Sequence, residues 1–186
     1  MKKKLSITTL LFLMCALIML FTNGCGARYM VKGQVIDAEN GNAIEGAAIV
    51  ISWIGHKFGP PYASGEHTLE VAEDLSDENG TFQIPKYVSK SFYMGVYKKG
   101  YVCWNSQDIL LKKTAKGRHY KKRKGFKIEN GMKIKLEVFT DEYSRNQHAH
   151  FTDNTAGICE APYNNGIFRK AARFEILLHN KLLRGE

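Results

Sequence analysis

The most reactive side chains of this sequence are the thiols of its four cysteines. Cys15 lies in an uncharged apolar run, whereas Cys103 and Cys159 lie in the part of the chain with globular composition. In an oxidising compartment this even pair predicts a disulfide, and closing so long a loop would stabilise the fold by about 4 kcal/mol. Two buried free thiols are the alternative, and a nucleophilic pair of one thiol with His148 is another.

Cys25 follows an N-terminal segment whose pattern predicts export. Three lysines at 2–4 form a basic start, residues 5–21 carry no charge, and a short polar stretch precedes the cysteine. This order is typical of a secretory signal peptide. Because Gly24 is a small residue directly before a cysteine, the segment resembles a bacterial lipoprotein signal, in which the cysteine is lipidated and becomes the new N-terminus. We therefore expect residues 1–24 to be a lipoprotein signal peptide.

Lipidation of Cys25 predicts where the protein acts. Several acyl chains hold a protein on a membrane durably, so we expect a membrane-anchored lipoprotein of the cell envelope, facing the periplasm or the cell surface. Gly26 after the cysteine favours the outer membrane. Asn23 departs from the usual small or apolar residue, so ordinary secretion stays open. An uncleaved anchor stays open too, because an apolar run of about 17 residues is near the lower limit for spanning a bilayer.

A strip of basic residues is the most distinctive local feature of the remaining chain. Residues 112–127 hold nine Lys or Arg side chains and no acid, in a protein with a net charge of +9. In a cytosolic protein this strip would suggest nucleic acid, but export argues against that partner. We expect an anionic surface, such as lipid headgroups or acidic glycans, to bind Lys121, Lys122, Arg123 and Lys124. A solvated hairpin or disordered loop is the alternative.

No other group of residues has the spacing of a catalytic or metal site. His148 and His150 share a face only on a strand and have no evident third ligand, so we expect no metal and no cofactor. The serines lack the sequence of a nucleophile elbow. The acids at 73–78 lack the spacing of an EF-hand calcium loop and fit solvated turns. We therefore expect a protein that is not an enzyme.

Aromatic residues suggest a different kind of binding site, because flat rings cover the apolar faces of sugars. The candidates are Trp53, Phe58, Tyr62, Tyr93, Tyr97 and Trp104. A carbohydrate-binding or lipid-binding accessory protein would use Trp53 and Tyr62 together with the basic strip. Packing of the same rings in a core or at a sheet edge is the alternative.

Short strands must position these residues. Along most of the chain, sequences typical of turns separate one strand from the next. Asn40-Gly41 and Asn79-Gly80 predict tight reversals. Residues 132–138 alternate between apolar and charged side chains, as in a strand with one buried face. Residues 48–54 are apolar almost throughout and fit a strand buried on both faces. Short strands with turns between them predict a β-sandwich.

The pattern becomes helical after Phe139. Residues 140–143 can begin a helix, with Thr140 or Asp141 as its cap. Further apolar residues recur at helical spacing between a cap at Asn164 or Asn165 and Gly185. They are Ile167, Ala171, Phe174, Leu178 and Leu182. We expect this second helix to pack against the sandwich.

Three segments resemble the carboxypeptidase regulatory-like domain, in the order found in that family. They are residues 31–50, with VKGQVID, NG and AIEGAAIV, residues 76–82, SDENGTF, and residues 99–101, KGY. The family has a seven-stranded, transthyretin-like sandwich. The resemblance thus implies a mainly β fold, an Ig/transthyretin-like β-sandwich over residues 29–139. The helical C-terminal extension that we expect over residues 140–186 falls outside the resemblance.

The resemblance implies a non-catalytic module, because the catalytic carboxypeptidase domain of such proteins is absent here. The expected function is that of a structural or interaction module of the cell envelope, anchored to the membrane through its N-terminal lipid. An envelope protein or a glycan is the expected partner. The alternative is an accessory protein that binds carbohydrate or anionic lipid.

Overall fold

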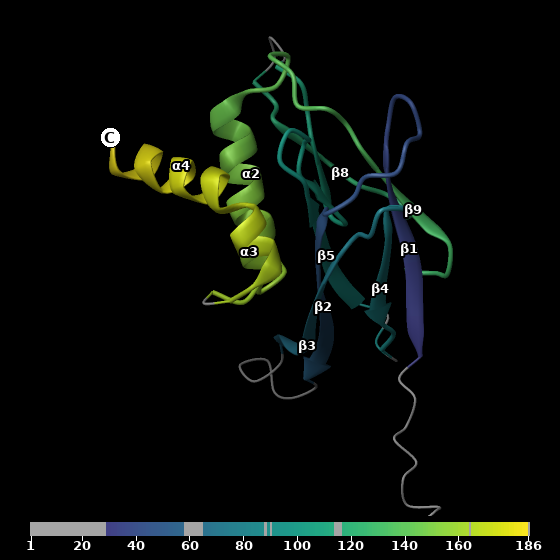
Figure 1. Cartoon of the computed structure of the whole chain (residues 1–186). Helices are drawn as coiled ribbons and strands as arrows, with labels where there is room; N and C mark the ends of the chain where they lie inside the picture. Colours follow the sequence, from purple (N-terminus) through teal and green to yellow (C-terminus); the bar gives the residue numbers. More distant parts are fainter. Residues whose placement is uncertain are drawn as a thin grey trace, which may run out of the picture.

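A computed structural model describes residues 29–57, 65–87, 89, 91–113, 117–163 and 165–185. The predicted anchor, Cys25, and two predicted aromatic site residues, Phe58 and Tyr62, lie outside them. The described chain forms three layers, in which two β-sheets pack face to face and helices cover the outer face of the second sheet (Figure 1). This is the mainly β, Ig-like sandwich with a helical C-terminal extension that the sequence predicts.

The first sheet has β1 (Met30–Asp37) at its centre. Strand β4 (Thr81–Pro85) pairs with β1 in antiparallel fashion, and β9 (Met132–Leu136) pairs with it in parallel fashion on the other side. In β9 the three apolar side chains are buried and both lysines are exposed. The alternation predicted from the sequence is thus confirmed, and its buried face closes one side of the sandwich.

The second sheet is the middle layer of the molecule. In order across the sheet, its strands are β3 (Gly65–Leu75), β2 (Ala48–Lys57), β5 (Ser91–Tyr97) and β6 (Trp104–Asn105). Strand β2 is buried on both faces, as its apolar sequence predicts. Ile49 and Ile51 contact the core between the sheets, whereas Ala48 and Val50 contact the core beneath the helices.

Both predicted Asn-Gly reversals contain a glycine in the left-handed region. Gly41 has a φ of 75° and Gly80 a φ of 70°, which glycine adopts without the steric cost that a Cβ imposes. Gly80 is also tightly packed, because a Cβ there would lie 2.4 Å from the backbone oxygen of Val35. These turns bring β1 and β4 into register.

The C-terminal part forms more helices than the sequence predicts. Helix α2 (Arg145–Ile158) begins after Ser144, and Thr140 lies in a preceding turn, so the predicted start at 140–143 was wrong. The predicted second helix is two, α3 (Ile167–Ala171) and α4 (Arg173–Arg184). Its predicted end is confirmed, because Gly185 adopts a left-handed conformation with a φ of 72°.

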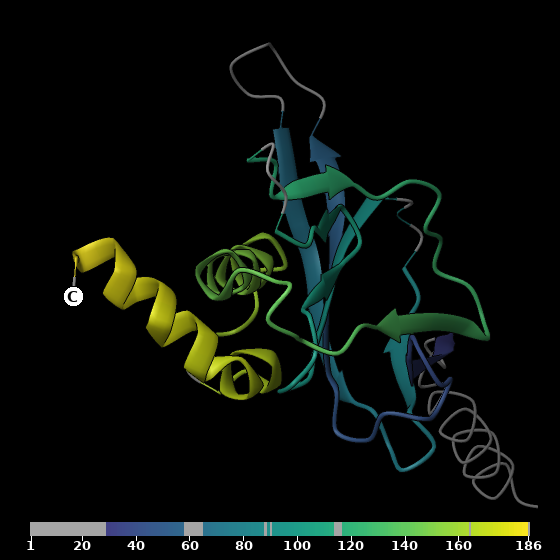
Figure 2. The same cartoon turned by 90° about the horizontal axis from the view of Figure 1, so that it is seen from above.

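The two longer helices differ in what they cover. Helix α2 and α3 pack on the second sheet, whereas α4 packs mainly on α2 and extends away from the sheets (Figure 2). The prediction that the last helix packs on the sandwich therefore holds for α3 and is wrong for α4. Among the helices in the described part of the chain, none is both long and apolar enough to cross a bilayer.

A small separate hairpin carries part of the predicted basic strip. Strand β7 (Asp108–Leu110) pairs in antiparallel fashion with β8 (Tyr120–Lys122). We call these two strands, with residues 123–124, the basic hairpin. It follows β6 in the chain and lies near the N-terminal part of α2, because the Tyr120 hydroxyl bonds to side chains of that helix.

Candidate functional site

Two ionisable side chains, Glu175 and His148, are buried beneath the helices, and the exposed Arg145 pairs with the first of them. Glu175 of α4 is 3% exposed, and its Oε1 lies 3.0 Å from Nη2 of Arg145. Its Oε2 lies 3.5 Å from Nδ1 of His148, a residue that is 2% exposed. The Nε2 atom of His148 accepts a hydrogen bond of 2.9 Å from the backbone N–H of Cys103. That bond assigns the proton of a neutral ring to Nδ1, which faces the carboxylate.

This buried cluster joins elements and is closed to a substrate. Arg145 and His148 belong to α2, and Glu175 belongs to α4. The His148 ring stacks on Tyr97 at a centroid distance of 6.4 Å and contacts Phe139 at 4.7 Å. Burial raises the pKa of the Tyr97 hydroxyl, and the charge of Glu175 raises it further. The buried His148–Glu175 contact joins α2 to α4, and the bond from the Cys103 N–H to His148 ties α2 to the segment before β6.

Cys103 and Cys159 are buried free thiols in the structure, so the predicted disulfide is not formed in it. Both belong to the same apolar cluster, and burial raises the pKa of the Cys103 thiol to about 12. Burial also raises the pKa of Cys159, and Cys103 raises it further. Since the thiolate is the reacting form, neither cysteine is poised as a nucleophile. Because both thiols lie in this cluster, a disulfide between them stays a prediction for the exported protein.

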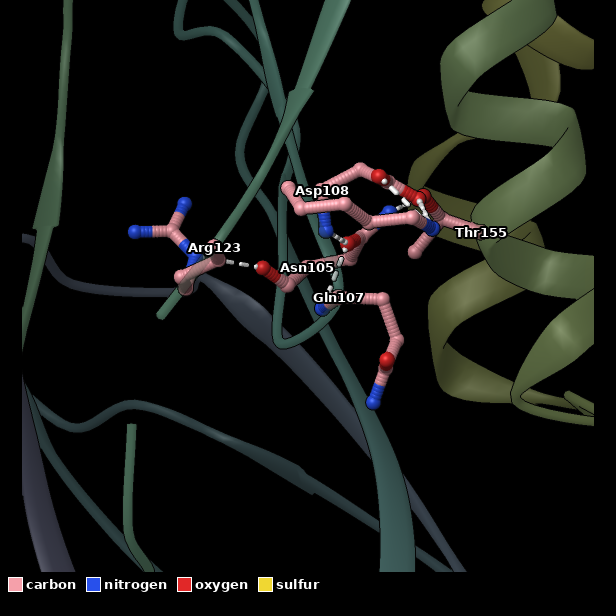
Figure 3. A network of polar contacts seen from close by, with 6 residues as sticks. Asn105, Gln107, Asp108, Arg123 and Thr155 are labelled. Carbon is pink, nitrogen blue, oxygen red and sulfur yellow. Dashed lines mark hydrogen bonds and ion pairs between the residues drawn. The ribbon is translucent and has the colours of Figure 1, made fainter. Parts of the chain in front are cut away.

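Asn105 connects the basic hairpin to the sheet and to the helices (Figure 3). Its side-chain Oδ1 accepts hydrogen bonds from the backbone N–H groups of Gln107 and Asp108, at 2.9 and 2.6 Å. Its Nδ2 donates to Oγ1 of Thr155 in α2, at 3.0 Å. Its backbone oxygen accepts from Nε of Arg123, at 2.8 Å. The sequence gives no signal for this role, because all the partners outside the turn are distant along the chain.

The four basic residues predicted to bind an anionic surface do not act as one set. Arg123 packs over Trp104, with Cζ 4.5 Å from the ring centroid, and burial lowers its pKa to about 10. Lys122 pairs with Asp108 at an Nζ–Oδ1 distance of 3.0 Å. Lys121 and Lys124 are exposed. Binding of an anionic surface by the strip therefore stays a prediction that now depends mainly on these two lysines.

Two of the acids that fitted solvated turns, Glu73 and Asp74, are half-buried and bond to other elements, whereas Asp77 is the exposed turn acid that the sequence predicts. The carboxylate of Glu73 accepts hydrogen bonds of 2.9 Å from the backbone N–H groups of Ile167 and Phe168, at the start of α3. Asp74 accepts from a backbone N–H of β4 at 2.6 Å. Asp77 accepts from two N–H groups of its own turn. A carboxylate suits a helix start because the N–H groups there are unpaired within the helix.

The histidine pair is divided between two environments. Both residues lie on α2, where positions two apart point in different directions. His148 is buried, whereas Nδ1 of His150 lies 2.9 Å from the Tyr120 hydroxyl and its ring lies 4.9 Å from that of His179. No group of three His, Cys, Asp or Glu side chains is placed to hold a metal in the described ranges.

The described aromatic candidates do not share one surface. Trp53 and Trp104 lie in the core between the sheets, and Tyr97 lies beneath the helices. Tyr93 donates a hydrogen bond of 2.9 Å to Glu66. The alternative of packing is thus confirmed for Trp53, Trp104 and Tyr97, although Trp53 also forms one wall of a pocket.

This aromatic pocket has a volume of about 520 Å³, within the range of small-molecule sites. Its lining includes Trp53, Lys86, Tyr87, Phe92, Phe126, Lys127 and Ile128. The ring of Trp53 stacks on Tyr87 at 6.2 Å and contacts Phe92 at 5.8 Å. Sequence reasoning missed all but Trp53. The available signal was the placing of lysines beside apolar residues at 86–87 and 126–128.

Comparisons with known proteins add no family to these observations. No family model and no curated protein matches the chain. The C-terminal domain of the shaft pilin SpaA from Lactobacillus rhamnosus GG is 15% identical, with 60% of this chain and 98% of that domain covered and a TM-score of 0.32. A streptococcal ancillary pilin is 12% identical, with 59% and 29% covered and a TM-score of 0.31. These values are too low to carry a functional conclusion.

The exposed side of the helical layer is a second candidate site. Phe174 of α4 is 59% exposed, and Leu177 and Leu182 are also exposed. Leu183 is 72% exposed near the end of the helix. Large apolar side chains that stay exposed together often mark a surface that binds a partner. Phe174 and Leu177 lie about one turn apart on α4, whereas Leu183 lies on another side of this helix, which packs mainly on α2.

Proposed function

We propose that the protein is a non-catalytic lipoprotein of the cell envelope, whose sandwich and helical layer form an interaction module. The observation that carries the interaction is the set of large apolar side chains that α4 exposes, which includes Phe174, Leu177 and Leu183. An envelope protein is the partner that fits it, because large aliphatic side chains and a phenyl ring on one short helix are typical of protein interfaces.

The chemistry of the described residues supports a role without catalysis. The groups of the one nucleophilic pair considered from the sequence are in structural contacts: Cys103 and Cys159 are buried thiols, and His148 lies against the buried Glu175 of α4. The carboxypeptidase regulatory-like resemblance is part of the same proposal. It is supported by the sandwich itself and by the two turns that end in Gly41 and Gly80.

Lipidation of Cys25 is the part of the proposal that fixes location, and metabolic labelling tests it. We expect radioactive palmitate to enter the wild-type protein but not Cys25→Ser, and the labelled protein to fractionate with the outer membrane. No label on the wild type, or equal label on both proteins, would overturn the anchor.

Photocrosslinking inside cells tests the interaction surface of α4. A photoreactive residue at Leu177 is expected to give a discrete protein adduct, whereas the same residue at Lys133, exposed on β9, is the matched control. The adduct should disappear when Phe174→Ser and Leu183→Ser are added. Equal adducts at both positions, or an adduct with glycan only, would contradict a protein partner for α4.

A further inference from the structure

The aromatic pocket lies at the end of the sandwich where the chain enters β1. The backbone N–H of Lys86 donates to the backbone oxygen of Tyr29 at 2.8 Å, and Met30 pairs with Pro85 in the sheet. Tyr87, the next residue along, stacks on Trp53 inside the pocket. A short series of contacts thus connects the first described residues directly to the pocket.

This position keeps the pocket close to the proposed anchor, so the inference rests on the proposed lipidation of Cys25. Five peptide steps separate Cys25 from Met30, and an extended chain spans at most about 17 Å over that number of residues. Whatever path these residues take, the start of β1 cannot be farther than this from the lipidated cysteine. The opening of the pocket is therefore held near the membrane surface.

The chemistry of the pocket matches an amphipathic anion. Phe92, Phe126 and Ile128 supply partly buried apolar walls. Lys86 and Lys127 are exposed beside these walls. Lysine side chains pack their apolar stems against such walls while their ammonium groups meet phosphate, and rings of this kind are favoured at membrane interfaces.

Trp53 adds a second, independent observation. The residue is 2% exposed, and its indole Nε1–H has no hydrogen-bond partner among the described residues. A buried donor of this kind is costly unless something accepts from it. Because this nitrogen has less than 1 Å² of accessible surface, an ester or phosphate oxygen of a bound lipid would reach it only after the neighbouring rings shift.

From these observations we propose that the aromatic pocket binds an anionic phospholipid of the membrane that carries the anchor. The acyl region lies against the rings and Ile128, and the phosphate lies between Lys86 and Lys127. The lipid anchor brings the protein to the membrane, and the pocket then fixes which end of the sandwich faces it.

Vesicle binding by the mature chain without its acyl group tests this proposal. The protein begins at residue 25 and carries Cys25→Ser, so neither an acyl group nor the apolar run at 5–21 contributes. It also carries Trp104→Phe, so that Trp53 reports alone as the remaining tryptophan of two. We expect phosphatidylglycerol vesicles to change Trp53 fluorescence saturably, with binding at least about 10-fold weaker for phosphatidylcholine. Soluble glycerol phosphate is the third probe and is expected to produce no change at the same phosphate concentration.

Two double variants with the same charge change locate the binding. Lys86→Gln with Lys127→Gln should weaken binding to phosphatidylglycerol about 30-fold, since each lysine near an anionic surface contributes roughly 5-fold. Lys133→Gln with Lys135→Gln, exposed on β9, should change it less than about 2-fold. All four lysines are exposed, so both variants are expected to fold as the parent does.

The outcomes separate this proposal from the proposed function. Equal loss in both double variants would show unspecific attraction, and glycerol phosphate binding as tight as vesicle binding would show a site for free phosphate; either result overturns the proposal. Palmitate on the wild type without vesicle binding by the unlipidated chain overturns the pocket and leaves the anchor standing. Vesicle binding with no palmitate at Cys25 supports the pocket and overturns the anchor.

Discussion

The interior between the two sheets and the interior beneath the helices are built from different chemistry. Between the sheets, alternating strand residues supply an apolar core, and the other buried polar residues, Asp37, Ser76 and Ser106, lie at strand ends or directly after them. Beneath the helices, buried apolar residues are interspersed with polar ones. They are Ser52, Asn105, His148, Thr152, Thr155 and Glu175. The first interior depends on the area that it buries, whereas the second depends on particular partners.

This difference predicts two kinds of response to substitution. An apolar core loses stability in proportion to the atoms removed and the cavity left. In a buried polar cluster, removing one partner costs more stability than the pair itself contributes. The reason is that the remaining partner stays buried without a group to bond to. The helical layer is thus expected to detach as a unit after a single substitution, while the sandwich stays folded.

Removal of Glu175 is the strongest test of that contrast. Glu175→Ala leaves the buried His148 without its carboxylate partner and opens a cavity, so we expect a loss of about 2–4 kcal/mol. Amide hydrogen exchange should speed up in α2 and α4 while β1 and β9 keep their protection.

The matched control for this variant is Glu129→Ala, at an exposed acid in the loop before β9, which should change stability by less than about 0.5 kcal/mol. Loss of protection throughout the chain with Glu175→Ala would mean that the two interiors unfold together, and the contrast between them would fail.

A disulfide between Cys103 and Cys159 is the second test of the comparison, because both cysteines lie in the interior beneath the helices. For the exported protein, isolated without reductant, we expect no free thiol from Cys103 or Cys159 after denaturation, and a decrease in stability of about 2–4 kcal/mol on reduction. Thiol titration and urea unfolding measure the two effects.

Protein made in a reducing compartment is the control for the predicted bridge. It should release two thiols on denaturation, and neither should react quickly in the native state, since burial raises both pKa values. Two free thiols in the exported protein as well would remove the predicted bridge.

The same contrast explains which parts of the structure could be predicted from the sequence. Alternation over residues 132–138, the apolar run of β2 and the two Asn-Gly turns are local signals, and each depends on neighbours within a few residues. The layer beneath the helices depends on contacts such as Asn105 with Thr155 and Glu73 with α3. These partners are distant along the chain, so no local pattern reports them.

The candidate sites were predictable to different degrees. Composition located the basic strip but could not show that Arg123 packs over Trp104 or that Lys122 pairs with Asp108. The number of basic residues in a segment does not tell which of their side chains are free to bind an anion. The sequence does not reveal the aromatic pocket because its rings come from separate segments. Only the pairing of β1 with β4 brings Tyr87 near the start of β1.

The distance between the middle sheet and α2 provides a third test. Gly95 allows close approach, since a Cβ there would lie 2.6 Å from Cγ2 of Thr155. Gly95→Ala should therefore destabilise the protein by about 1–3 kcal/mol through overpacking. Gly157→Ala is the matched control, because nothing lies within 4 Å of a Cβ there and alanine favours helix; it should stabilise by about 0.5–1 kcal/mol. Equal effects would show that this interface tolerates added volume.

The cap of α3 gives a smaller expected effect. Glu73→Gln keeps one oxygen as an acceptor but replaces the other and removes the charge, so we expect a loss of about 1 kcal/mol. Glu78→Gln, in the exposed turn before β4, should leave stability within about 0.5 kcal/mol of wild type. Chemical denaturation measures both, and a neutral Glu73→Gln would show that neutral acceptors suffice at this helix start.

The smallest expected effect belongs to the ion pair of the basic hairpin, and it completes the comparison. Lys122 and Asp108 form an ion pair at 3.0 Å, and the Lys122 side chain is mostly in solvent. A double-mutant cycle with Lys122→Met and Asp108→Asn should therefore give a coupling energy of about 0.2–1 kcal/mol. In 1 M salt that coupling should vanish, because the screening length falls to about 3 Å. A cycle of Arg145 with Glu175 should keep most of its coupling in the same salt, since the carboxylate is buried. If both couplings vanish together, water reaches the layer beneath the helices, and its polar residues are bound by the same weak forces as the surface.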